Sequence, residues 1–113
     1  MRLDGFVLIA AALLCSQWVQ AQTQALTQAE REVGRRLYAT CAACHGTEGE
    51  PVAGTSLPAL AGQSAEALTA SMKAFQDGSR PATIMHQIAK GYTSEQIELI
   101  ADYLATTATS KRP

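Results

Sequence analysis

Apolar side chains recur at helical spacing in four stretches of the chain, and residues that break helices separate these stretches. A first helix is predicted from Thr27 onward, ending at Gly46 because glycine commonly terminates a helix. Its inner face is formed by residues that return every three or four positions: Val33, Leu37, Cys41, Cys44 and His45.

Three more helices are predicted beyond residue 62. Ser64 is expected to cap the second, Pro81 to lie in the first turn of a short third, and Thr93 or Ser94 to cap the last. Their inner stripes are, in order, Leu68, Met72 and Phe75; Ile84, Met85 and Ile88; and Ile97, Ile100, Ala101 and Leu104. Because the last stripe fades after Leu104, residues 106–113 are predicted to form a loose end.

The segment between the first two helices is predicted to be a long loop. It contains too many helix-breaking residues for any regular element: Gly46, Gly49, Pro51, Gly54, Pro58 and Gly62. No strand pattern appears anywhere, so the fold class is all-α, with about four helices. A loop of this length in so small a domain needs a reason, and wrapping the edge of a cofactor supplies one.

The first 21 residues have the layout of a secretory signal peptide. Arg2 precedes an unbroken apolar run, Phe6–Cys15, and Val19-Gln20-Ala21 places small residues at the −3 and −1 positions of a cut. The run is about half as long as a membrane span, which disfavours a retained anchor, and Leu14 disfavours acylation of Cys15. We therefore expect cleavage after Ala21, a periplasmic location, and one domain over residues 22–113 with no membrane anchor.

Composition narrows the chemistry further. The chain has 113 residues and a formal net charge of −1, so it has no basic field for nucleic acid. Aromatic residues make up 5% of it. A chain this short buries a modest core, and a bulky apolar cofactor would supply much of the missing contact.

Cys41-Ala42-Ala43-Cys44-His45 has the spacing of a covalent haem attachment site. Side chains at i, i+3 and i+4 share one helix face, so two thiols can join the two vinyl groups of one porphyrin while His45 lies under the iron. A thioredoxin-like redox pair would need a preceding strand, and a plain disulfide would leave His45 unexplained. A zinc site would need His86 as a fourth ligand.

The second axial ligand of a low-spin haem iron has three candidates. Met85 is favoured, because it follows the long loop and a whole helix and so can reach the opposite porphyrin face. Met72 lies on the buried stripe of a helix, where methionine usually fills space, and His86 is the third candidate. The free ring nitrogen of His45 is expected to donate to a carbonyl, for which the Pro58 carbonyl is the leading candidate.

Together these residues resemble those of class I cytochromes c, over roughly Glu30 to Leu104. The resemblance includes a helix pair in which Tyr103 faces Gly34. The segment Phe75–Tyr92 resembles the cytochrome subunit of flavocytochrome c sulfide dehydrogenases. In that family an FAD-containing flavoprotein oxidises sulfide and the cytochrome takes the electrons one at a time, so the resemblance implies a monohaem electron-transfer subunit that is not an enzyme by itself.

The sequence therefore predicts periplasmic electron transfer by one covalent haem c, with a sulfide-oxidising flavoprotein as donor and another redox protein as acceptor. Two other functions stay open. One is a free cytochrome that shuttles electrons between respiratory complexes; the other is a haem enzyme with an open iron position, against which Met85 argues. The small apolar residues beside the motif, Ala42, Ala43 and Ala53, favour lasting docking over brief salt-steered encounters.

Overall fold

The computed structural model describes Gln20 and residues 27–110, with 108–110 described by their backbone alone. The chain divides into two compact units, Met1–Glu30 and Arg31–Pro113. In the first unit Gln20 and residues 27–30 are helical. The predicted signal peptide over 1–21, apart from Gln20, lies outside the described residues, as does its cleavage point.

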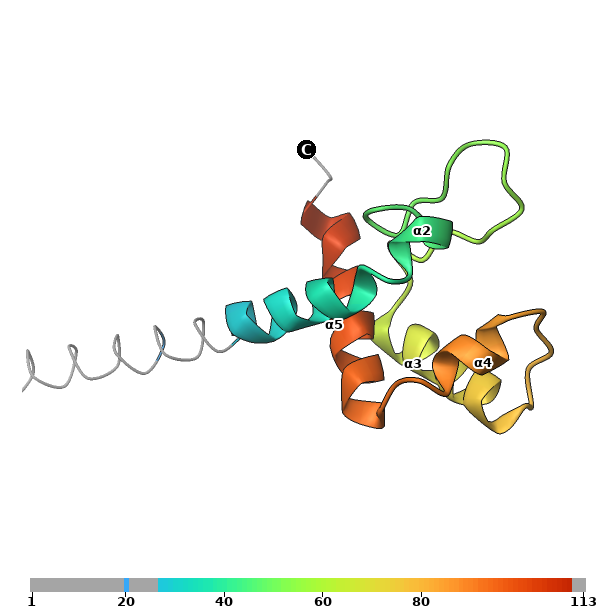
Figure 1. The fold of residues 1–113 in the computed structure, drawn as a ribbon. Coiled ribbons are helices and arrows are strands. Elements are labelled where there is room, and N and C mark those ends of the chain that lie inside the picture. The colour runs from blue at the N-terminus through green and yellow to red at the C-terminus, as the bar shows by residue number, and fades with distance from the viewer. Residues whose placement is uncertain (1–19, 21–26, 111–113) are drawn as a thin grey trace, which may run out of the picture. The chain divides into compact units, whose positions relative to one another are not determined.

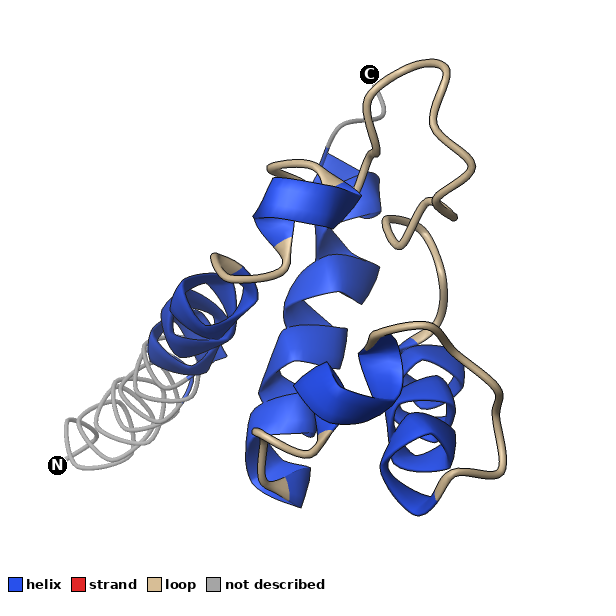
Figure 2. Ribbon diagram, turned by 45° about the vertical axis from the view of Figure 1, so that its right-hand side comes forward, coloured by secondary structure: helices blue, strands red, loops and turns tan. Residues whose placement is uncertain are grey.

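All regular structure of the described residues is helical (Figure 2), which confirms the predicted all-α class. After the helical residues 31–38 come four labelled helices (Figure 1): α2 (Ala42–His45), α3 (Ala65–Asp77), α4 (Met85–Ala89) and α5 (Ser94–Ser110). Residues 46–64 between α2 and α3 contain turns and bends only, as predicted for the long loop.

The first helix ends earlier than the sequence predicts. Helical structure stops at Tyr38, a turn covers residues 39–41, and α2 is a separate helical turn that Gly46 terminates with φ of 82°. One continuous helix up to Gly46 is therefore wrong. The turn separates the attachment motif from the preceding helix, which periodicity alone could not indicate.

The buried face of this first helix also differs from the prediction. Val33 is 45% exposed, whereas Gly34 and Tyr38 are buried, with Tyr38 only 1% exposed. A Cβ at Gly34 would overlap the carbonyl oxygen of Leu99 and lie 3.0 Å from the Cβ of Tyr103. The predicted Gly34–Tyr103 helix pair is thus confirmed. The stripe is centred on a glycine because that is where α5 crosses.

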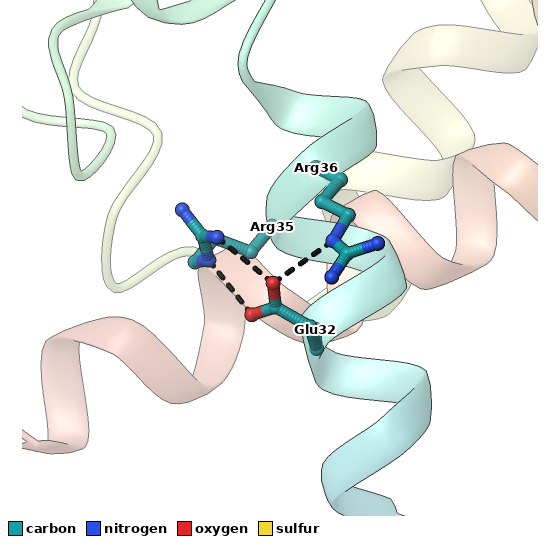
Figure 3. Close-up of polar contacts among 3 residues, drawn as sticks. All are labelled: Glu32, Arg35 and Arg36. Atoms are coloured by element: carbon teal, nitrogen blue, oxygen red, sulfur yellow. Dashed lines mark hydrogen bonds and ion pairs between the residues drawn. The ribbon is translucent and has the colours of Figure 1, made fainter.

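The outer face of the same helix carries a local charge cluster. The carboxylate of Glu32 accepts two hydrogen bonds of 2.8 Å from Arg35 and one of 2.9 Å from Arg36 (Figure 3). These bonds lower the pKa of Glu32 to about 2. Both arginines lie about one helical turn from Glu32, so the cluster stabilises the helix locally.

Helix caps define α3 and α5 much as predicted. The Ser64 hydroxyl accepts a hydrogen bond from the Ala67 backbone at 3.2 Å, and Gly78 ends α3 in the left-handed conformation. Thr93 and Gln96 form a reciprocal capping box at the start of α5, with bonds of 3.0 and 3.2 Å.

The core lies between α5, α3 and the first helix. It contains the whole predicted stripe of α5 together with residues from the other two helices, all at most 7% exposed: Tyr38, Leu68, Ile97, Ile100, Ala101, Tyr103 and Leu104.

Two predictions about the start of the short third helix are wrong. Pro81 does not begin a helix, because α4 starts at Met85, and Ile84 is 60% exposed.

The predicted loose end at 106–113 is wrong as far as the structure describes it. Helix α5 continues to Ser110, and residues 111–113 lie outside the described part. Thr106 and Thr107 carry no hydrophobic signal, yet both hydroxyls donate to the Tyr103 carbonyl, at 2.9 and 2.7 Å. Satisfying the hydroxyls inside the helix lets Thr107 stay buried.

Candidate functional site

Helix α2 gathers the attachment motif into a single turn. The backbone amides of Cys44 and His45 both donate to the Cys41 carbonyl, at 3.1 and 2.9 Å. Both thiols are free; Cys41 is half-buried and Cys44 exposed, while His45 is buried at 8% exposure. Two accessible thiols beside a buried imidazole are the arrangement that attachment of a flat ligand at its edge requires.

The Cys41 thiol has a pKa above the ordinary value of a cysteine. Burial raises its pKa, and a hydrogen bond with the side chain of Tyr92 partly opposes that rise. Tyr92 and Cys41 both pack against the core cluster around Tyr38. Packing against this cluster therefore positions the attachment sulfur.

Tyr38 fixes the end of the motif turn, a role that sequence reasoning missed. Its hydroxyl donates a 2.6 Å hydrogen bond to the Gly46 carbonyl, and its ring lies 5.7 Å from that of Tyr103. Gly46 has no room for a side chain, because a Cβ there would overlap the Glu50 carbonyl oxygen. The sequence feature that could have indicated this role is the position of Tyr38, three residues before the first cysteine of the motif.

The predicted hydrogen bond between His45 and the Pro58 carbonyl is not formed. The Nδ1 atom of His45 is buried and finds no partner among the described residues. The loop is anchored near its end, where the amides of Leu60 and Ala61 donate to the Gly49 carbonyl. Residues 52–59, which include Pro58, are all exposed.

Each candidate for the second axial ligand is half-buried. Met85 is the first residue of α4, and Met72 lies on α3 on the face predicted to be buried. His86 follows Met85, and its Nδ1 atom is also buried without a partner in the described part of the chain. Among the described residues no three or more of the His, Cys, Asp or Glu type come together, so Cys41, Cys44, His45 and His86 are not gathered in one place.

The two segments that flank the motif and Met85 expose large apolar side chains. Val52 and Leu57 on the loop after α2 are 74% and 38% exposed, and Ile84 just before Met85 is 60% exposed. A large apolar ligand between these segments would cover such surface, at about 25 cal/mol for each Å² removed from water. Exposed apolar surface on both segments, together with the motif turn, fits a haem.

The structure and its motif define a class of protein: a small all-α domain with two thiols and a histidine on one turn for covalent haem. The family model for cytochrome c matches residues 32–108, and the chain belongs to the cytochrome c family. It therefore contains covalently bound haem c and transfers electrons. None of the helices in the described part has the length and apolarity needed to cross a bilayer.

Several characterised proteins are similar to this chain. The cytochrome subunit of sulfide dehydrogenase from Chlorobaculum tepidum is 43% identical over 70 residues, 62% of each chain. Cytochrome c-554(548) from Halomonas halodenitrificans is 42% identical over 76 residues, 65% of this chain and 90% of that protein. The thiosulfate dehydrogenase electron acceptor of Stutzerimonas stutzeri is 41% identical over 68 residues, 58% of this chain and 31% of its own. The matches thus span less than two thirds of the first and third relatives.

Proposed function

We propose that Cys41 and Cys44 hold the haem through thioether bonds, with His45 and Met85 as its axial ligands. Each thiol adds its S–H across one vinyl group, so no electron is gained or lost by the protein. When bound, haem supplies one-electron chemistry at its iron, and the protein sets its position and burial. The observation that carries this proposal is the single turn in which two free thiols lie beside a buried imidazole.

Acid–acetone extraction of the denatured holoprotein tests the covalent attachment. The red colour should stay with the protein, because thioether bonds survive the treatment, and Cys41→Ala with Cys44→Ala should release it. His45→Ala should leave little folded holoprotein. Colour that moves into the organic phase from the wild-type protein would contradict the proposal.

Met85 is proposed as the distal ligand because it begins a helix that follows the long loop and the whole of α3. The ferric protein should show a weak sulfur-to-iron charge-transfer band in the far red, and Met85→Ala should abolish it. Met72→Ala is the matched control: it should keep the band and lose only packing, about 2–5 kcal/mol if the site cannot collapse. A band that survives in the Met85 variant and is lost in the Met72 variant would reverse the assignment.

The proposed setting is the periplasm, where residues 22–113 remain after removal of residues 1–21 and accept electrons from a sulfide-oxidising flavoprotein. Similarity to the cytochrome subunit of sulfide dehydrogenase supports this donor. The exposed small apolar residues beside the motif, Ala43 and Ala53, support an apolar docking surface at the haem edge. Flavin gives up two electrons in total, and the haem accepts them singly.

Co-expression with a flavoprotein encoded beside this chain tests the donor. Purification through a tag on one subunit should retain both at high salt, and added sulfide should reduce the haem rapidly. Amino-terminal sequencing of the exported protein should begin at Gln22.

A diffusible electron carrier is the second candidate, favoured by the match over 90% of a relative named only as a cytochrome. In that case no flavoprotein would co-purify. Electron exchange with a respiratory complex would then slow steeply as salt is raised.

A further inference from the structure

A glutamine on α3 is bonded across to the far end of the helix that begins with Met85. The side-chain amide nitrogen of Gln76 donates to two carbonyls, that of Ala89 at 2.8 Å and that of Tyr92 at 2.9 Å. An amide nitrogen has two hydrogens, so both are used. The acceptors lie on either side of the turn that joins α4 to α5, which one side chain therefore fixes at two points.

Helix α4 depends on such contacts for its position. It has five residues, too few to form a stable helix alone. The segment that leads into it is largely exposed, at Arg80, Pro81, Thr83 and Ile84. Arg80 at the start of this segment is bonded to Ser71 and Ala74 of α3, but Thr83 and Ile84, next to Met85, are exposed. At its other end, α4 is held by the packing of Ala89 and by the two bonds from Gln76.

Ala89, the residue held by Gln76, shares a helix face with Met85. Positions i and i+4 lie above one another on a helix, and Ala89 is completely buried. The face on which Met85 lies is thus the face that α4 turns toward the interior. Because the Ala89 carbonyl is held, α4 cannot rotate freely about its axis. Such a rotation would turn the Met85 side chain away from the interior.

The second bond, from Gln76 to the Tyr92 carbonyl, holds a segment that lies close to the attachment motif. Gln76 fixes the backbone of Tyr92, and the Tyr92 side chain packs with Cys41 against the core cluster. Tyr92 and Cys41 thus lie against the same cluster, where the Tyr92 side chain also opposes the rise in the pKa of the Cys41 thiol. One side chain on α3 is therefore connected to both the distal helix and the first attachment residue.

We propose that Gln76 is the positioning residue for the distal ligand, holding α4 so that Met85 stays on the haem iron. The inference rests on the proposed ligation by Met85 and goes beyond it. Gln76 acts through the backbone that it holds, at Ala89 in α4 and at Tyr92 beyond it. Without its two bonds, α4 should loosen and Met85 should leave the iron more often, while the rest of the fold persists.

Imidazole titration of the ferric holoprotein measures how often that position opens. Added imidazole binds the iron only when Met85 has left, so its apparent Kd falls as the open fraction rises. Loss of the far-red charge-transfer band reports the exchange. Gln76→Glu keeps the shape but removes both donors and places a carboxylate against two carbonyls, and it should lower the apparent Kd at least tenfold.

Gln87→Glu is the matched control. Gln87 is exposed on α4, the helix that carries Met85, and the change in charge is the same as in Gln76→Glu. Its imidazole affinity should equal that of the wild type. Gln76→Met, which preserves volume without adding charge, should behave like Gln76→Glu and serves if the latter does not accumulate as holoprotein.

The outcomes separate the two proposals. If the Gln76 variants only lower the unfolding midpoint and leave the imidazole affinity unchanged, Gln76 is a structural residue and the inference is overturned. Equal tightening by Gln87→Glu would overturn it as well. A wild-type protein that lacks the far-red band would contradict the Met85 ligation and, with it, this inference.

Discussion

Gly34→Ala should destabilise the holoprotein, although alanine is the better helix former. In the interior of an isolated helix this exchange would stabilise by about 1 kcal/mol. Here the new methyl group would overlap the Leu99 carbonyl oxygen and lie 3.0 Å from both the Leu99 carbonyl carbon and the Tyr103 Cβ. None of these atoms can turn away as the end of a long side chain can, so the first helix and α5 must separate.

The separation needed is set by ordinary contact distances. Carbon atoms that are not bonded normally stay about 3.5–4 Å apart, so the crossing must widen by about 0.5–1 Å. Overpacking of this kind costs about 1–3 kcal/mol, and backbone contact places Gly34 at the upper end. After subtraction of the propensity gain, the net loss should be about 2 kcal/mol, or a fall in Tm of about 8–16 °C for a domain of this size.

Guanidinium unfolding of the holoprotein, followed by far-ultraviolet circular dichroism, measures this loss. Val33→Ala is the control, since Val33 is adjacent on the same helix and 45% exposed; it should change the free energy of unfolding by less than about 0.5 kcal/mol. A Gly34→Ala protein as stable as the wild type, or more stable, would refute the close crossing.

Three further substitutions test other parts of the structure. Tyr38→Phe removes the donor to the Gly46 carbonyl and should lower the free energy of unfolding by about 1 kcal/mol near neutral pH. Because burial raises the pKa of Tyr38 from 10.0 to about 12, this difference in stability should persist below pH 10 and disappear as the pH rises to 12. Glu32→Gln should remove a stabilisation that is present above pH 4.5 and lost as the pH falls toward 2, because hydrogen bonds to two arginines lower the pKa of Glu32; unfolding midpoints across this range, at low and high salt, will show it. Thr93→Ala breaks the capping box with Gln96 and should cost about 1 kcal/mol in chemical denaturation; a Thr93→Ser protein as unstable as Thr93→Ala would contradict this capping role.

The last helix was predictable because its signals are local. The stripe of α5 from Ile97 to Leu104 repeats at helical spacing, and the caps Ser64 and Thr93 act within three residues of their partners. The attachment motif was predictable for the same reason, since its geometry is confined to one turn.

Features that depend on distant parts of the chain were missed. Hydrophobic periodicity placed Val33 on the buried face of the first helix, which is in fact centred on Gly34; the contact of Gly34 with Tyr103 was predicted from the residue pair and not from that periodicity. Gln76 bonds to carbonyls 13 and 16 residues away, a pairing that no local pattern contains. The prediction that the Pro58 carbonyl accepts a hydrogen bond from His45 depended on the course of a loop, and loops carry the weakest sequence signal.

Mass spectrometry of the peptide that contains Cys41–His45, cut from the purified exported protein, tests the central claim most directly. We predict that this peptide carries one haem, with both Cys41 and Cys44 modified and neither thiol free to react with an alkylating reagent. Recovery of the same peptide without haem, with its two cysteines joined in a disulfide or open to alkylation, would contradict the account.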